Sequence, residues 1–453
     1  MKPSALAGVH DYAGYWPAAV AAAIGMAITL WLFYPGWLSI DSATQYQQAL
    51  TGQYDNVHPP LLAWLWRQTD ALWPGPAGLY LPLTAIWWTA LALITGRWLP
   101  GWRGMLAALA IGLTPPVLLI AAHLWKDVAL SAALLVATAA IAAQRSRGHW
   151  APLAVALLAL MAAVALRHNA WPAALPLLLW MAWPRGVDKA WRARRVGATL
   201  ALALVLALTP ALIGRALGAA DRQPWSAVLL WDLAAVSVAS GRVLVPPQVS
   251  AADLSVDDLA AGYVSWANPP MFVGDKIRLG FFTPYSDADR RAVIGAWLAM
   301  LREHPRAYLA HRWRVTRYLL FGPPPHAPRE LVYVAARILP PKARITLPPL
   351  DRARDRTILR VAEALRGTPL FAGATWLALA LIAALLAWRR RHSEAGRAAL
   401  ALSASAWAYA APLALITGSA EFRYLHWTVI AALLAALAAI AARRAPSGHN
   451  HRP

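Results

Sequence analysis

The 453-residue chain contains no cysteine and few charges of either sign. Disulfides, thiolate catalysis and cysteine-based zinc sites are therefore excluded. Charged residues make up only 14% of the sequence while hydrophobic residues make up 59%, and there are 25 tryptophans. This balance is too apolar for a soluble protein of this length and predicts a polytopic membrane protein.

The few charges are strongly biased toward basic residues, which outnumber acidic ones by 42 to 21. In a soluble protein this excess would suggest nucleic acid, but here the arginines gather in short segments between apolar runs, as the positive-inside rule describes. We therefore expect anionic membrane lipids as partners and no nucleic acid. A Walker-type glycine loop is missing as well, which argues against direct use of a soluble nucleotide.

The long apolar runs predict an all-α fold of about ten transmembrane helices, since about 20 residues span a bilayer. The expected spans are 16–37, 78–96, 103–123, 127–143, 151–168, 170–184, 196–217, 367–388, 397–416 and 425–442. With the basic loops in the cytoplasm, both termini are cytoplasmic and the loop after the first span faces outward. The expected location is the bacterial inner membrane, with a site on the periplasmic side.

Three parts are expected along the chain. Residues 1–217 form an N-terminal membrane module whose first outer loop, 38–77, carries surface helices. Residues 218–366, with shorter apolar runs, form a mostly helical periplasmic or interfacial domain, in which 289–320 is expected to be one long helix. Residues 367–453 supply the last membrane helices and a basic cytoplasmic tail.

The first outer loop holds the leading candidate, Asp41, directly after the first span. A carboxylate at membrane depth needs a partner or a function. Ser42 and Gln45 form a capping-box pattern that predicts a helix beginning at Ser42 and ending near Gly52. A second surface helix is expected from His58-Pro59-Pro60 onward, since proline is tolerated in the first turn.

The predicted topology brings polar residues from several outer loops to the same face of the membrane as Asp41. Basic groups there suit a phosphate or pyrophosphate, and a facing carboxylate could act as general base. Asp127 and Asp55 are the other candidate catalytic carboxylates. The candidate substrate-binding residues are His58, Lys126, Arg167, His168, Glu421, Arg423 and Tyr424.

Several of these candidates also have a structural interpretation. Asp41 and Asp127 could cap helices, Asp55 could be a solvated loop carboxylate, and Glu421 could pair with Arg423 in a tight loop. His304 and His311 lie seven residues apart, and we interpret them as structural because no carboxylate accompanies them at matching spacing.

An acidic residue after the first span, the following His58-Pro59-Pro60 with its surface helices, and an acidic position in the next outer loop resemble the GT-C superfamily of integral membrane glycosyltransferases. The protein O-mannosyltransferases and lipid A aminoarabinose transferases belong to it, and Lys126-Asp127, Arg167-His168-Asn169 and Glu421-Phe422-Arg423-Tyr424 resemble elements of its uncharacterised bacterial members. The likeness covers most of 16–215 and, weakly, the last two helices.

The resemblance implies a polyprenyl-phosphate sugar donor, a lipid, glycan or protein acceptor on the outer face, Asp41 as catalytic carboxylate and Asp127 in the second acidic position. Transfer in a single displacement would invert the anomeric centre. Ser42 stands where the commonest family pattern has a second acidic residue, so the use of a divalent metal and the acceptor class stay open.

Two other functions stay open at this stage. A transporter or flippase of a lipid-linked saccharide would need the same basic cavity without a base, but inverted repeats and broken helices with midplane polar residues are not evident. A membrane scaffold would have no need of charged residues inside the bilayer face.

Overall fold

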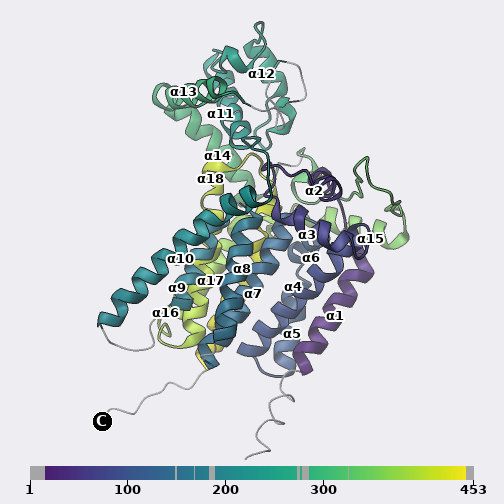
Figure 1. Cartoon of the computed structure of the whole chain (residues 1–453), viewed down its shortest axis with the longest axis vertical. Coiled ribbons are helices and arrows are strands. Elements are labelled where there is room, and N and C mark those ends of the chain that lie inside the picture. Colours follow the sequence, from purple (N-terminus) through teal and green to yellow (C-terminus); the bar gives the residue numbers. More distant parts are fainter. Residues whose placement is uncertain are drawn as a thin grey trace, which may run out of the picture.

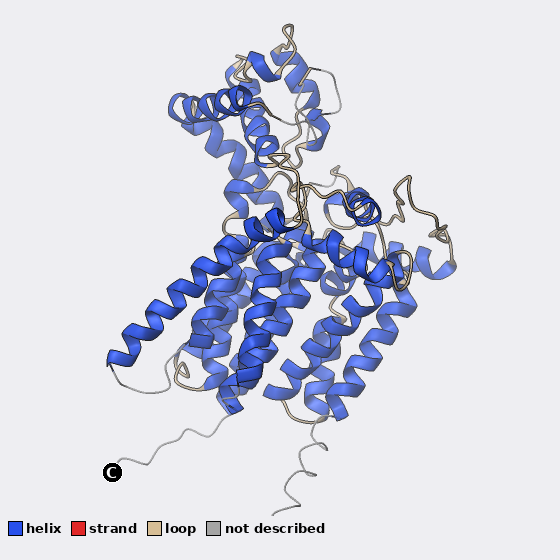
Figure 2. Cartoon of the chain, in the orientation of Figure 1, coloured by secondary structure: helices blue, strands red, loops and turns tan. Residues whose placement is uncertain are grey.

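The computed structural model describes residues 16–147, 150–167, 169–182, 189–272, 276–277, 285–324 and 326–444. These residues form helices and connecting loops with isolated β-bridges and no strand (Figure 2). The helices are α1 (Trp16–Phe33), α2 (Ile40–Thr51), α3 (Leu61–Asp70), α4 (Pro76–Trp98), α5 (Trp102–Gly112), α6 (Pro115–Ala121), α7 (Lys126–Arg147), α8 (Trp150–Leu166), α9 (Trp171–Ala182), α10 (Lys189–Ala216), α11 (Trp225–Ser240), α12 (Val256–Gly262), α13 (Asp287–Glu303), α14 (Pro305–Phe321), α15 (Ala353–Leu365), α16 (Gly373–Trp388), α17 (Glu394–Ala410), α18 (Leu413–Ile416) and α19 (His426–Arg444).

The predicted all-α polytopic membrane fold is confirmed. Among the described residues, six helices are long and apolar enough to cross a membrane, or seven if α5 and α6 form one span bent by 69°. The bend falls before Pro115-Pro116, since proline has no backbone N–H for the preceding turn. The shorter apolar helices α8, α9 and α16 stand beside the long ones in the same bundle (Figure 1).

The bundle is closed by the C-terminal helices, although they are far from the N-terminal module in sequence. Helix α19 packs against α16 and α17 and also against α7 and α4, and its residues are mostly buried. An apolar helix covered on several sides belongs in the interior of a bundle. The loop that precedes α19, which carries Arg423, is thereby placed next to the start of α7.

At one end of the bundle lie the surface helices α2 and α3, and α11 to α14 form a separate lobe beyond that end (Figure 1). The prediction of one long helix over 289–320 is wrong. In the lobe this stretch forms two helices, because α13 ends at Glu303 and α14 starts at Pro305. The His304-Pro305 step breaks the helix, since a residue before proline is driven away from helical geometry.

Candidate functional site

Helix α2 places Asp41 at the bundle end. The expected N-cap was Ser42, but the structure has Ser39 as the cap, so Asp41 lies inside the first turn, where the helix dipole favours a negative charge. The Ser39 hydroxyl accepts hydrogen bonds from the Ser42 backbone N–H at 3.4 Å and from the Trp125 indole at 2.8 Å. The Trp125 contact, which no local pattern reveals, ties the start of α2 to the residue before α7. The helix ends at Gly52 with φ 70°, as predicted.

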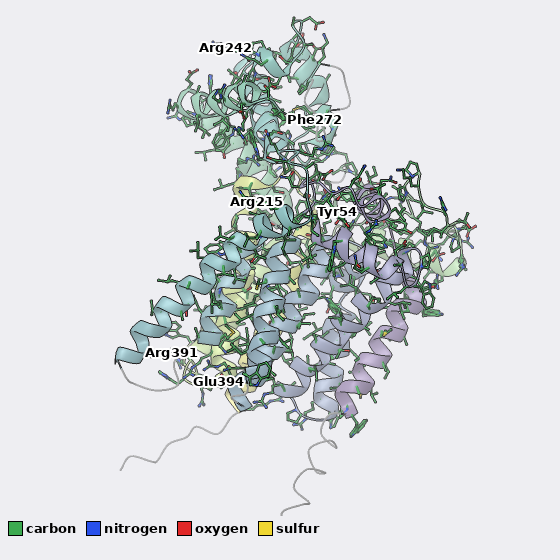
Figure 3. The ribbon with its side chains drawn as sticks, viewed as in Figure 1. Tyr54, Arg215, Arg242, Phe272, Arg391 and Glu394 are labelled. Carbon is green, nitrogen blue, oxygen red and sulfur yellow. The ribbon has the colours of Figure 1, made fainter. Side chains whose placement is uncertain are left out.

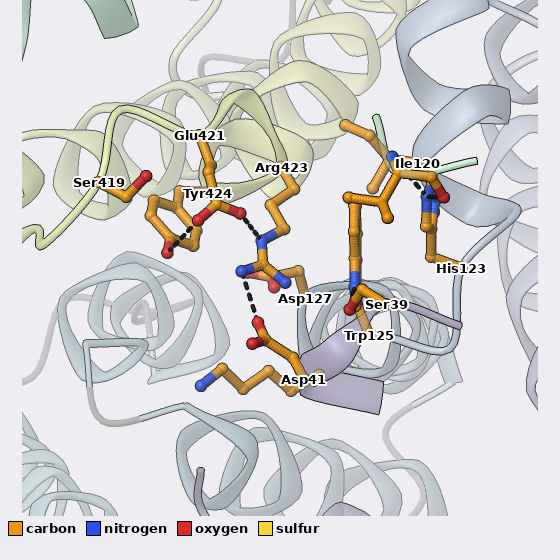
Figure 4. Close-up of polar contacts among 12 residues, drawn as sticks. Ser39, Asp41, Ile120, His123, Trp125, Asp127, Ser419, Glu421, Arg423 and Tyr424 are labelled. Atoms are coloured by element: carbon orange, nitrogen blue, oxygen red, sulfur yellow. Dashed lines mark hydrogen bonds and ion pairs between the residues drawn. The ribbon is translucent and has the colours of Figure 1, made fainter. Parts of the chain in front are cut away.

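Arg423 is the direct partner of Asp41. One of its terminal guanidinium nitrogens lies 2.6 Å from Asp41 Oδ2, and its Nε pairs with Glu421 (Figure 4). The guanidinium also lies 4.5 Å from the centre of the Trp125 ring, a cation–π arrangement. Arg423 is therefore held by two carboxylates and an aromatic face, with its fork directed at Asp41.

His58 connects Asp41 to a second cation, Lys126. The Lys126 ammonium lies 2.7 Å from His58 Nδ1, and His58 Nε2 lies 3.7 Å from Asp41 Oδ1. Because an ammonium can only donate, Nδ1 must accept, and the proton of the neutral ring is then on Nε2. The ring therefore presents its N–H toward Asp41.

The pKa values of Asp41 and His58 agree with this arrangement. Burial by itself would raise the pKa of Asp41, but the positive charges of Arg423 and Lys126 hold it well below its usual range. Burial lowers the pKa of His58 to about 3, and the charge of Lys126 acts in the same direction. At neutral pH the site thus contains an ionised carboxylate and a neutral imidazole.

Asp127 and Arg167 form a second, buried ion pair next to this group. Arg167 Nε donates to Asn169 Oδ1 at 2.8 Å, and the Arg167 guanidinium lies 4.3 Å from the centre of the Tyr424 ring. Arg423 lies 5.3 Å from the same ring, and Tyr424 donates its hydroxyl proton to Glu421 at 3.2 Å. Tyr424 therefore separates the two arginines and joins the two ion pairs into one cluster.

Exposure distinguishes the three carboxylates of this cluster. The side chain of Asp41 is 30% exposed, that of Glu421 19% and that of Asp127 1%. A group must be reachable to exchange a proton with a substrate. Asp41 is thus the carboxylate best placed to meet one, and Asp127 is placed to orient Arg167.

The outer lobe holds the loop that carries Glu421 and Arg423. Within the lobe, Asp232 on α11 is 1% exposed and pairs with Arg312 at 2.7 Å and with His311 at 3.2 Å. Arg312 also donates to the Thr417 carbonyl oxygen at 2.8 Å. The Ala420 N–H donates to the carbonyl of Trp266 at 2.7 Å, and the Asn268 N–H donates to the carbonyl of Gly418 at 2.9 Å, so several hydrogen bonds join the lobe to the loop.

Most of the candidate residues lie together in this cluster, with two exceptions. Asp55 makes no ion pair among the described residues; its carboxylate accepts from the Val57 backbone N–H at 3.1 Å, a local turn contact, and its backbone forms a bridge with Ala220. Asp55 therefore lies apart from the ion pairs around Asp41. His168 lies outside the described residues.

Sequence reasoning missed Ser39, Trp125, Asp232 and Arg312. Asp232 could have been predicted to matter, because it is a single carboxylate within the apolar run Trp225–Ser240. A charge buried there requires a partner of opposite charge. No pattern pointed to Ser39 or Trp125, because their contact joins two distant loops. Within the described ranges, no group of three or more His, Asp or Glu side chains is arranged to hold a metal ion.

Comparison with protein-family models gives no match, and comparison with curated proteins gives none either. Among solved structures, the chain is similar to the crystal structure of ArnT from Cupriavidus metallidurans bound to undecaprenyl phosphate. The identity is 13% and the TM-score 0.33, with 94% of this chain and 77% of that chain covered.

Proposed function

We propose that this chain is a glycosyltransferase that moves a sugar from a polyprenyl-phosphate-linked donor to a lipid, glycan or protein acceptor, with inversion, at the periplasmic face of a bacterial inner membrane. The observation that best supports this proposal is the contact between Asp41 and Arg423. Asp41 is the most exposed carboxylate of the cluster, and it lies 2.6 Å from the Arg423 guanidinium, whose side chain is 8% exposed.

The cations of the cluster suit the phosphate of such a donor. An arginine fork binds phosphate oxygens with two parallel, charge-assisted hydrogen bonds, and a lysine adds a point charge. Arg423 and Lys126 both border Asp41, one directly and one through His58. A phosphate bound between them would lie beside the carboxylate.

Asp41 would act as general base on the acceptor hydroxyl. As the acceptor oxygen bonds to the anomeric carbon, the bond from that carbon to the phosphate oxygen breaks, the hydroxyl proton passes to Asp41, and polyprenyl phosphate leaves with the electron pair. No acid is required, because Arg423 and Lys126 stabilise the charge that develops on the leaving phosphate. A single displacement with one base inverts the configuration.

The Arg423 pair gives this base a substrate-dependent strength. In the free protein, Arg423 holds the pKa of Asp41 far below its usual range, which makes the carboxylate a weak base. A donor phosphate that shares Arg423 adds negative charge beside Asp41, and like charge raises the pKa of a carboxylate. Asp41 would become an effective base only when the donor is present.

The orientation in the membrane is supported by the arginines at the opposite end of the bundle, where α16 is followed by Arg389-Arg390-Arg391 and α19 ends at Arg444. Clusters of this kind mark the cytoplasmic side. The lobe and its flanking segments, 218–366, would then lie outside, between the membrane parts 1–217 and 367–453.

The test is donor turnover by the purified full chain in nanodiscs. A radiolabelled mixture of polyprenyl-phosphate sugars is supplied with an extract of envelope lipids and glycans as acceptors. Wild type is compared with Asp41→Asn and with Asp257→Asn, a control on α12 whose side chain is exposed. We expect free polyprenyl phosphate from wild type and control, and a rate lower on the order of 100-fold or more for Asp41→Asn.

Unchanged turnover by Asp41→Asn would move catalysis to another carboxylate. Donor binding without turnover by all three proteins in nanodiscs, together with movement of the donor across the bilayer of sealed proteoliposomes that contain the wild type, would favour the transporter instead.

A further inference from the structure

A large cavity lies in the half of the bundle away from Asp41. It has a volume of about 780 Å³ and opens between α4, α7 and α8. Its walls are almost entirely apolar and mostly small, with Ala85, Ala139 and Ala151 on the three helices and the exposed Leu93 and Val155 at its edge. We name this cavity the α4/α7/α8 groove.

The groove runs along the bundle axis and covers one leaflet. On α4 its lining extends from Ala85 to Arg97, and twelve residues of helix rise about 18 Å. The hydrocarbon core of a bilayer is about 30 Å thick. An apolar groove of this length that opens to the side can hold one acyl chain of a lipid from one leaflet.

The groove ends in a polar pocket with unpaired donors. Arg97 and Ala142 line both the groove and an adjoining pocket of about 280 Å³. Arg97 is exposed and has no ion-pair or hydrogen-bond partner in the part of the chain that the structure describes. The indole N–H of Trp180, which also lines this pocket and is 3% exposed, has no acceptor among those residues.

The other basic group of the pocket, Arg145, is already neutralised. Arg145 makes a two-pronged pair with Glu394, at 2.5 and 2.7 Å, and donates to the Trp180 carbonyl at 2.9 Å. Glu394 lies at the end of the bundle away from Tyr54 of the first outer loop (Figure 3). Among its described residues the pocket thus keeps one cation without a partner, Arg97, beside the buried indole N–H of Trp180, and this pair fits a phosphate oxygen.

We infer that this is a binding site for an anionic phospholipid of the leaflet opposite the Asp41 cluster, with an acyl chain in the α4/α7/α8 groove and the headgroup phosphate at Arg97 and Trp180. The charge of Arg97 selects for net negative lipids, since attraction to a membrane surface charge adds to affinity for each basic residue. The site is separate from the proposed transfer chemistry and does not depend on it.

The experiment measures lipid retention by native mass spectrometry of the full chain released from nanodiscs of equal parts phosphatidylglycerol and phosphatidylethanolamine. Wild type is compared with Arg97→Gln, with Ala139→Trp, which fills the groove, and with Arg103→Gln. Arg103 is an exposed arginine near the same bundle end that lies over its neighbour Trp102 and does not line either cavity. Apparent unfolding temperatures are measured for all four proteins.

We expect wild type and Arg103→Gln to retain one phosphatidylglycerol in preference to phosphatidylethanolamine. Arg97→Gln should lower that preference roughly fivefold, and Ala139→Trp should remove retention of both lipids. Equal retention of the two lipids by wild type, or the same loss in Arg97→Gln and Arg103→Gln, would overturn the assignment. If Ala139→Trp lowers the unfolding temperature, the two arginine variants decide the question, because they alter no packed residue.

Discussion

The Asp41 carboxylate and the Arg423 guanidinium lie 2.6 Å apart, although one belongs to the start of α2 and the other to the loop before α19. The contact needs the whole bundle, because α2 and α19 must both be in place before the two side chains meet. It also couples the strength of a base to the occupancy of an arginine, which makes the pair the centre of the proposed chemistry.

The energetic coupling of this pair can be measured directly. Unfolding of wild type, Asp41→Asn, Arg423→Gln and the double variant forms a double-mutant cycle, and we expect a coupling free energy of roughly 0.5–3 kcal/mol. Arg423→Gln should in addition weaken binding of polyprenyl phosphate, whereas Asp41→Asn should not, because Arg423 contacts the phosphate in the proposed complex and Asp41 does not. Additive effects in the cycle would show that the contact contributes nothing.

The cap of α2 should matter for activity beyond its contribution to stability. Ser39→Ala removes the acceptor for both the Ser42 N–H and the Trp125 indole, at a cost of about 1 kcal/mol. Because the cap orients the turn that carries Asp41, donor turnover should fall by up to about 100-fold.

Ser393→Ala is the matched control for Ser39→Ala. Ser393 caps α17 by accepting from the Gly396 N–H and lies far from Asp41 in the bundle. We expect a similar loss of stability with normal turnover. A comparable drop in turnover for both variants would mean that general destabilisation explains the Ser39 effect.

Acidification should destabilise the protein through histidines that are buried in the neutral form. Burial lowers the pKa of His58 and of His123 to about 3, below the value of about 6.5 in the unfolded chain. The unfolded state therefore binds more protons once the pH falls below 6.5, and stability is lost from there down to about 3. In this range the free energy of unfolding should fall by about 1.4 kcal/mol per pH unit for each histidine.

The Asp41 carboxylate affects stability only at a lower pH than the histidines do. Its pKa is depressed in the folded state, so its contribution to stability is complete above about 3.9 and is lost only at lower pH. Between pH 7 and 5 the decline should thus come from histidines. Unfolding temperatures of wild type and His58→Gln across this range test the point, and an unchanged slope in His58→Gln would exclude His58 as a contributor.

The buried ion pair of Asp232 and Arg312 in the lobe should hold in place the loop that carries Arg423. Arg312→Gln leaves Asp232 without its cationic partner, which costs about 3–5 kcal/mol in a buried pair, and removes the hydrogen bond to Thr417. We expect lower thermal stability and weaker binding of polyprenyl phosphate. Arg317→Gln, on the exposed side of α14, is the control and should change neither quantity.

The features that could be predicted from the sequence are those that depend on neighbours along the chain. Apolar segment length predicted the membrane helices, the Gly52 stop and the start after Pro59-Pro60 were evident from turn chemistry, and the basic loops implied one common face for Asp41, Lys126, Arg167 and Arg423. The break at Pro305 has a local cause too, since proline disrupts a helix by a clash with the preceding turn, although the apolar pattern of 289–320 had favoured one continuous helix.

Which of these groups contact one another depends on tertiary packing. The pairing of Asp41 with Arg423, of Asp127 with Arg167 and of Lys126 with His58 depends on how α2, α7 and α19 pack, and the sequence carries no local trace of that packing. Exposure, which separates Asp41 from Asp127, is likewise a property of the assembled bundle, because it depends on what other helices cover. The unpaired state of Arg97 has the same origin, because packing pairs Glu394, a carboxylate of the same pocket, with Arg145 and brings no described carboxylate into an ion pair with Arg97.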